Sequence, residues 1–142
     1  YNEGKEFSKS DASYDKALSI DPDNATVLNN YAYYLSERNE ELEKAERMSR
    51  KCNDLQPGVA TYLDTYAWIF YKQGKFSEAK TWQEKAIAAG GDKEAVLIEH
   101  YGDILFKLGD SAGAVVQWKK AKDLGGASEL IGRKITEGKL VE

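Results

Sequence analysis

Apolar residues recur along the chain with the period of a helix turn, and the whole pattern repeats about every 35 residues. Leu28, Tyr31, Ala32 and Leu35 stand at i, i+3, i+4 and i+7, which is one face of an amphipathic helix. The stripe returns twice at a spacing of 35 residues: Leu63, Tyr66, Ala67 and Phe70; Ile98, Tyr101, Gly102 and Leu105. The pattern predicts three equivalent helices, named A helices below.

A second set of helices, named B helices, is expected between them. Its aligned columns are Phe7, Leu42, Phe76 and Ser111; Ser10, Ala45, Ala79 and Ala114; Tyr14, Ser49, Gln83 and Trp118; Ala17, Cys52, Ala86 and Ala121. Small residues recur in both sets, as expected where two helix axes approach closely. Ala79→Leu should therefore destabilise the protein by about 1–3 kcal/mol. The short connections predict antiparallel hairpins.

Helix-breaking residues fall between the apolar stripes. Gly74 and Gly109 follow A helices, where a left-handed C-cap is expected. Asn24, Asp92 and Asp110 are predicted N-caps. The turns that close the B helices contain Pro22, Pro57, Gly90, Gly91, Gly125 and Gly126.

The residues after 126 predict one more helix of a different kind. Ser128 is its expected N-cap, Leu130, Ile131 and Ile135 share one face, and Gly138 ends it. An atypical terminal helix that covers the last apolar face is common in repeat proteins.

The run from Tyr62 to Ala79 resembles a tetratricopeptide repeat (TPR) hairpin nearly position by position, and residues 14–24 resemble a TPR B helix with its closing turn. The resemblance covers almost the whole chain. It implies an all-α, right-handed superhelical solenoid of antiparallel helix hairpins with a C-terminal capping helix. The expected units are a partial repeat, mainly helix B, at 1–24; repeats at 25–59, 60–94 and 95–126; and a capping helix and tail at 127–142. Two periods carry an extra residue, near 39–41 and 91–94.

The chain starts with Tyr1 and lacks most of the first A helix, so we interpret it as a fragment of a longer, bacterial-type TPR protein. Any targeting signal would precede it, which leaves cytoplasm and periplasm both open. The net charge of −4 disfavours nucleic acid as a partner, and no apolar run is long enough for membrane insertion.

Candidate chemistry is sparse. His100 stands near Glu99 and Asp103, but a metal site needs three or four convergent ligands, so we interpret His100 as an ordinary helix-surface residue. Cys52 occupies a column of alanines and is expected to be a small buried apolar residue. We therefore predict no catalytic residue, no metal site and no cofactor; the chain is not expected to be an enzyme.

The resemblance implies a concave face lined mainly by A helices, and the positions outside their apolar stripes should point there. These predicted partner-binding residues are Asn29, Tyr33, Ser36, Asp64, Trp68, Tyr71, Lys72, Glu99, Asp103 and Lys107. Trp68 is the principal expected anchor, since aromatic side chains carry much of the binding energy in many interfaces. Trp68→Ala should then weaken partner capture and leave melting nearly intact. Phe106 could either contact the partner or pack between helices.

The same resemblance bears on ligand chemistry. TPR proteins that clamp a C-terminal carboxylate use basic residues, whereas the matching positions here hold Asn29, Asn30, Tyr33, Thr61 and Thr65. An asparagine ladder is also lacking, because Thr65 and His100 follow Asn30 in its column. The acidic residues Asp64, Glu99 and Asp103 instead favour a peptide with apolar side chains and some positive charge.

The sequence thus predicts a non-catalytic interaction scaffold that binds an unknown protein or peptide segment. A structural self-assembly module, with weak homo-oligomers through exposed end faces, is one alternative, and light scattering across concentration separates the two. A substrate-recruiting region of a longer enzyme is another alternative.

Overall fold

The computed structural model describes residues 3–140, with side chains from residue 12 onward. It contains helices and no strand within this range. The elements are α1 (Glu3–Ile20), α2 (Ala25–Glu37), α3 (Leu42–Leu55), α4 (Ala60–Lys72), α5 (Phe76–Ala88), the short 3-10 helix η1 (Gly91–Lys93), α6 (Ala95–Lys107), α7 (Ser111–Leu124) and α8 (Ile131–Glu137). The predicted all-α class is confirmed. No described helix is long and apolar enough to cross a membrane.

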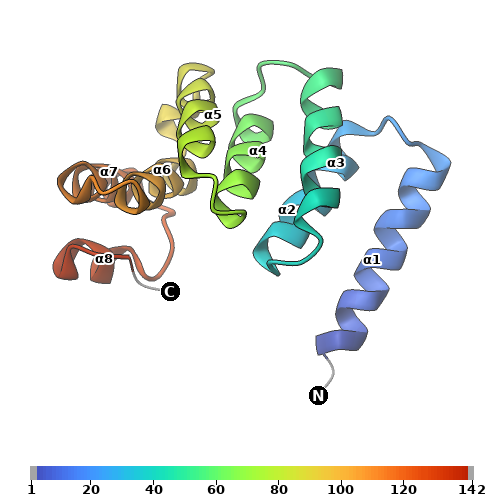
Figure 1. Cartoon of the computed structure of the whole chain (residues 1–142), viewed down its shortest axis with the longest axis horizontal. Coiled ribbons are helices and arrows are strands. Elements are labelled where there is room, and N and C mark those ends of the chain that lie inside the picture. The colour runs from blue at the N-terminus through green and yellow to red at the C-terminus, as the bar shows by residue number, and fades with distance from the viewer. Residues whose placement is uncertain (1–2, 141–142) are drawn as a thin grey trace.

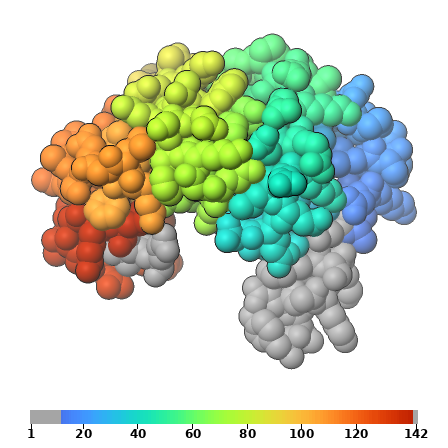
Figure 2. All heavy atoms as spheres, in the orientation of Figure 1, coloured from blue at the N-terminus to red at the C-terminus, as the bar shows by residue number. Residues whose placement is uncertain are grey.

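The helices pair in chain order and form an arch (Figure 1). The A helices α2, α4 and α6 each pack against the following B helix, α3, α5 and α7. Neighbouring A helices also contact one another, α2 with α4 and α4 with α6. Figure 2 shows the described part of the molecule curving from α1 at one end to α7 and α8 at the other, with a hollow between the two ends.

The predicted columns form the core of the stack. Ala45, Ala79 and Ala114, which mark the close helix crossings, are fully buried. Gly102 lies at a close crossing of α6 and α7, because a Cβ atom there would stand 2.5 Å from the ring of Trp118. The predicted contributions of Phe7 and Ser10 lie outside the described side chains.

Most of the predicted helix ends are confirmed. The side chains of Asn24 and Asp110 accept backbone N–H groups at 3.1 and 2.9 Å and cap α2 and α7. Gly74 and Gly109 have φ values of 81° and 93°, in the left-handed region that favours glycine. The prediction for Asp92 is wrong, because this residue lies inside η1 and α6 starts only after it.

Each predicted extra residue is absorbed by an irregular turn. Between α2 and α3, Asn39 and Glu41 take left-handed conformations with φ of 56° and 46°. Between α5 and α6, the chain makes the 3-10 helix η1. The hairpins on either side therefore keep their register.

The terminal helix α8 begins later than predicted. Ser128 is not its N-cap; its backbone N–H and hydroxyl donate instead to the Glu99 carboxylate of α6, at 2.8 and 2.5 Å. Ile131 and Ile135 pack into the apolar cluster that α6 and α7 form. Gly138, with φ of 64°, ends the helix as predicted.

Candidate partner-binding groove

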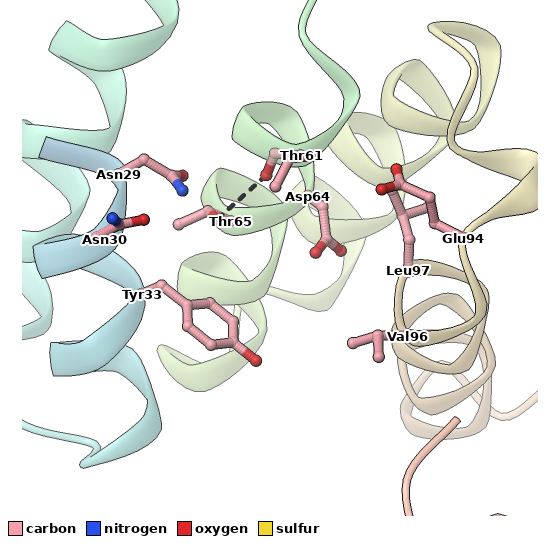
Figure 3. Close-up of a pocket in the computed structure, with 9 residues that line it drawn as sticks. All are labelled: Asn29, Asn30, Tyr33, Thr61, Asp64, Thr65, Glu94, Val96 and Leu97. Carbon is pink, nitrogen blue, oxygen red and sulfur yellow. Dashed lines mark hydrogen bonds between the residues drawn. The ribbon is translucent and has the colours of Figure 1, made fainter. Parts of the chain in front are cut away.

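Two adjoining pockets lie along the A helices. Pocket I has a volume of about 280 Å³ and is lined by Asn29, Asn30, Tyr33, Thr61, Asp64, Thr65, Glu94, Val96 and Leu97 (Figure 3). Pocket II has a volume of about 540 Å³ and is lined by Tyr33, Glu37, Trp68, Tyr71, Lys72, Val96, Glu99, His100, Asp103, Gly126, Ser128, Leu130, Lys134 and Leu140. Because Tyr33 and Val96 line both pockets, the two adjoin each other, and together they are called the groove across α2, α4 and α6.

Most of the predicted partner-binding positions lie along this groove. The ones that line a pocket are Asn29, Tyr33, Asp64, Trp68, Tyr71, Lys72, Glu99 and Asp103. Ser36 does not, because it is fully buried and its hydroxyl donates to the carbonyl of Tyr33 at 2.6 Å. Lys107 is exposed and lines neither pocket. Their role in binding stays a prediction.

Trp68 is not the free anchor that the sequence suggested. Only 6% of it is exposed, and its ring stacks on His100 and Tyr71 with centroid distances of 3.8 and 4.4 Å. The stack joins α4 to α6, so Trp68 forms the floor of the groove. Trp68→Ala should therefore remove about 3–5 kcal/mol of folding free energy, contrary to the expectation of nearly intact melting.

His100 is buried, so its interpretation as an ordinary surface residue is wrong. Its Nδ1 lies 3.0 Å from Oδ1 of Asp64, and the amide of Gln83 donates to the same oxygen at 2.8 Å. Burial alone would lower the pKa of His100, but the Asp64 carboxylate outweighs it and raises that pKa above its usual value. His100 thus anchors α6 to α4 with a charge-assisted hydrogen bond when it is protonated.

Lys134 is the main residue of this region that sequence reasoning missed. Its ammonium group donates from α8 to Glu99 at 2.7 Å and to the two oxygens of Asp103 at 2.9 and 3.2 Å. Trp118 also donates to Asp103, at 3.0 Å. Burial alone would raise the pKa of Glu99, but its hydrogen bonds from Lys134 and Ser128 lower it. All three acidic residues expected to attract a basic peptide are therefore already paired within the chain, Glu99 and Asp103 with Lys134 and Asp64 with His100.

The other aromatic residues divide between packing and the groove. Phe106 is half-buried and lies 6.0 Å from Trp118 between ring centroids, which assigns it to packing. Tyr33 is half-buried at the junction of the pockets. Burial and a hydrogen bond with Glu37 raise the pKa of the Tyr33 hydroxyl, so it stays protonated at neutral pH.

Cys52 lies away from the groove and is fully buried. This agrees with its predicted place in an aligned column of small apolar residues. Burial raises the pKa of its thiol to about 11, which keeps it from acting as a nucleophile at neutral pH. Among the side chains that the structure describes, residues 12–140, no group of three or more His, Cys, Asp or Glu residues is arranged to hold a metal ion.

The comparison with known proteins agrees with this architecture. Residues 13–47 and residues 60–89 each match a model of the tetratricopeptide repeat. These two segments are therefore similar to tetratricopeptide repeats. No curated protein matches the sequence significantly.

Solved structures of TPR proteins share the fold. The Sgt2 TPR domain from Aspergillus fumigatus is 20% identical with a TM-score of 0.71; the match covers 80% of this chain and 76% of that one. YrrB, described as a TPR protein with an unusual peptide-binding site, is 27% identical with a TM-score of 0.67, covering 88% and 60%. PilW, described as a widely conserved type IV pilus biogenesis factor, is 23% identical with a TM-score of 0.78, covering 97% and 65%. This chain thus spans less than two thirds of YrrB and of PilW.

Proposed function

We propose that this TPR chain is a non-catalytic interaction module that holds an extended segment of a partner protein in the groove across α2, α4 and α6. The observation that carries the proposal is that pockets I and II lie next to each other along the A helices and share the lining residues Tyr33 and Val96. A groove that crosses three successive A helices suits a peptide better than a small ligand, because each repeat adds one further contact site along the same face.

Two features of the groove support this assignment. Its floor is rigid, since Trp68 and His100 are locked in a stack, so little ordering is needed when a ligand binds. Its walls combine apolar surface with exposed polar side chains, such as Asn30, Thr61 and Glu94. A peptide backbone carries both donors and acceptors and can contact such groups. YrrB, with its described peptide-binding site, has the same fold.

A matched pair of exposed valines tests the proposal. Val96 lies in the groove and is 44% exposed, whereas Val116 lies on α7, lines neither pocket and is 59% exposed. In two separate variants, the photo-reactive amino acid benzoylphenylalanine would replace Val96 or Val116. The cells that express each variant would then be irradiated. We expect a discrete protein adduct from the Val96 position, with the cross-linked residues in one contiguous partner segment.

The Val116 variant sets the background of the same experiment. Equal yields of the same adduct from both positions would contradict binding of the partner in the groove. Adducts from Val116 alone would place the binding surface on the B helices, against the proposal.

A further inference from the structure

We propose that pocket I selects a cationic side chain of the partner segment, with arginine preferred over lysine. This inference rests on the proposed function and adds to it the chemistry of one contact.

The charges that line the two pockets differ in kind. Pocket I contains the carboxylates of Asp64 and Glu94 and no cationic side chain. Pocket II contains Lys72 and Lys134, and Lys134 pairs with its buried carboxylates. A positive group entering pocket I would meet the exposed carboxylate of Glu94 and the second oxygen of Asp64, whose Oδ1 pairs with His100, and a partner carboxylate would be repelled by Glu94.

Asn29 gives an independent indication of a ligand. It is only 6% exposed, lines pocket I, and its Oδ1 atom is buried without a hydrogen-bond partner among the described residues. Figure 3 shows its side chain directed from α2 into the space toward α4. An unpaired buried acceptor destabilises the free protein, and a donor from a ligand would satisfy it.

Asp64 has room for a further donor. Its hydrogen bonds to Gln83 and His100 within the described chain both end on Oδ1. Figure 3 shows its carboxylate in the space between α4 and α6, directed toward the level of Tyr33 and Val96, with Glu94 on the α6 side of the pocket. Acceptors therefore stand on both sides of pocket I, an arrangement that a planar guanidinium with five N–H groups matches better than a compact ammonium.

The walls suit the apolar stem of the same side chain. Val96, Leu97 and the ring of Tyr33 line the pocket beside the carboxylates. Long cationic side chains bury their methylene groups against such walls, and a guanidinium also stacks on an aromatic ring.

Two acetylated and amidated pentapeptides test the inference: Ala-Ala-Arg-Ala-Ala, and the same peptide with citrulline, which has the shape of arginine and no charge. Each is titrated into the isotope-labelled chain while backbone amide signals are followed by NMR. We expect the arginine peptide to shift the signals of Thr61, Thr65 and Val96 in a saturable way. The citrulline peptide should bind at least about tenfold more weakly, through loss of charge-assisted hydrogen bonds.

Two neutralised carboxylates provide the matched variants. Glu94→Gln should weaken the arginine peptide about fivefold to tenfold and leave citrulline binding unchanged. Asp92→Asn removes the same charge two residues away, at an exposed position outside the pocket lining, and should have little effect. The side chain of Glu94 makes no cap hydrogen bond to α6, so its replacement should leave the fold intact.

Three results would overturn the inference: equal binding of the two peptides, equal losses in the two variants, or no saturable shift around pocket I. None of these results bears on the photo-cross-linking at Val96. A groove that captures its partner but does not distinguish arginine from citrulline would refute the charge selection and leave the proposed function standing.

Discussion

Lys134→Met tests whether one lysine holds α8 on the solenoid. The change keeps an unbranched side chain of similar length and removes the ammonium group. In the wild type this group lies 2.7 Å from Glu99 and 2.9 Å from Asp103, and all three side chains are at most 7% exposed. The variant leaves two buried carboxylates next to each other without a counter-charge.

The size of the effect has two bounds. Removing one partner of a buried ion pair typically destabilises a protein by about 3–5 kcal/mol. The loss is limited by the docking free energy of α8, because undocking returns both carboxylates to water. The apolar part of that docking comes mainly from Ile131 and Ile135, each worth about 1.5–3 kcal/mol when fully buried. We therefore expect α8 to detach, at a loss of about 3 kcal/mol.

Hydrogen exchange and urea unfolding measure this loss. Amide protection in α8 should fall about 100-fold, since each 1.4 kcal/mol is about a factor of ten. The urea midpoint should drop by about 1–3 M. Lys139→Met is the matched control, because Lys139 is 62% exposed and pairs with the surface residue Glu137 at 3.6 Å.

A triple variant separates charge from packing. Glu99→Gln and Asp103→Asn, added to Lys134→Met, remove both stranded charges and should recover much of the lost stability. If Lys134→Met matches the wild type in α8 protection and urea midpoint, the ion cluster does not hold the helix and the reasoning fails.

Further measurements check the core and its titratable groups. Gly102→Ala should lower stability by about 1–3 kcal/mol in thermal unfolding, because its methyl group would overlap Trp118; Gly132→Ala, with open space around the new methyl, should not. The pKa of His100 is raised on folding, so its contribution to stability is complete below its unfolded pKa of about 6.5 and is lost as pH rises through the folded value. His100→Gln should flatten that part of the profile of urea midpoint against pH. Cys52, whose pKa burial raises to about 11, should react with a thiol reagent at pH 8 only after unfolding; rapid labelling of the native chain would contradict its placement.

The repeat pattern was sufficient to predict the fold because helix packing follows sequence spacing directly. Ala79 and Ala114 stand 35 residues apart, and both lie between packed helices with no exposed surface. The glycines Gly74 and Gly109 were equally predictable, since a left-handed C-cap excludes most other residues. The repeat limits at 24, 59, 94 and 126 remain predictions.

The groove was less predictable because an A helix in a solenoid has two packed faces. One face contacts its own B helix and gives the visible stripe. The other contacts the neighbouring A helices, and this second face buries Asp64 and Trp68 of α4 and His100 of α6. A residue outside the stripe is therefore not free for a partner. Lys134 was missed for a different reason: it follows Glu99 by 35 residues but belongs to an atypical helix, where the repeat alignment gives no equivalent position.

Because the A helices are packed on two faces, the groove has a buried floor and an exposed rim. Mutations in the floor and mutations in the rim should affect stability and binding differently. Floor residues such as Trp68 and His100 contribute to stability and to the shape of the groove together, so changes there alter both and cannot report on binding alone. Rim residues such as Thr61, Glu94 and Val96 are exposed and can change without disturbing the core. Selectivity among partners should therefore reside in the rim, which the first turns of α4 and α6 supply, while the floor stays constrained by the fold.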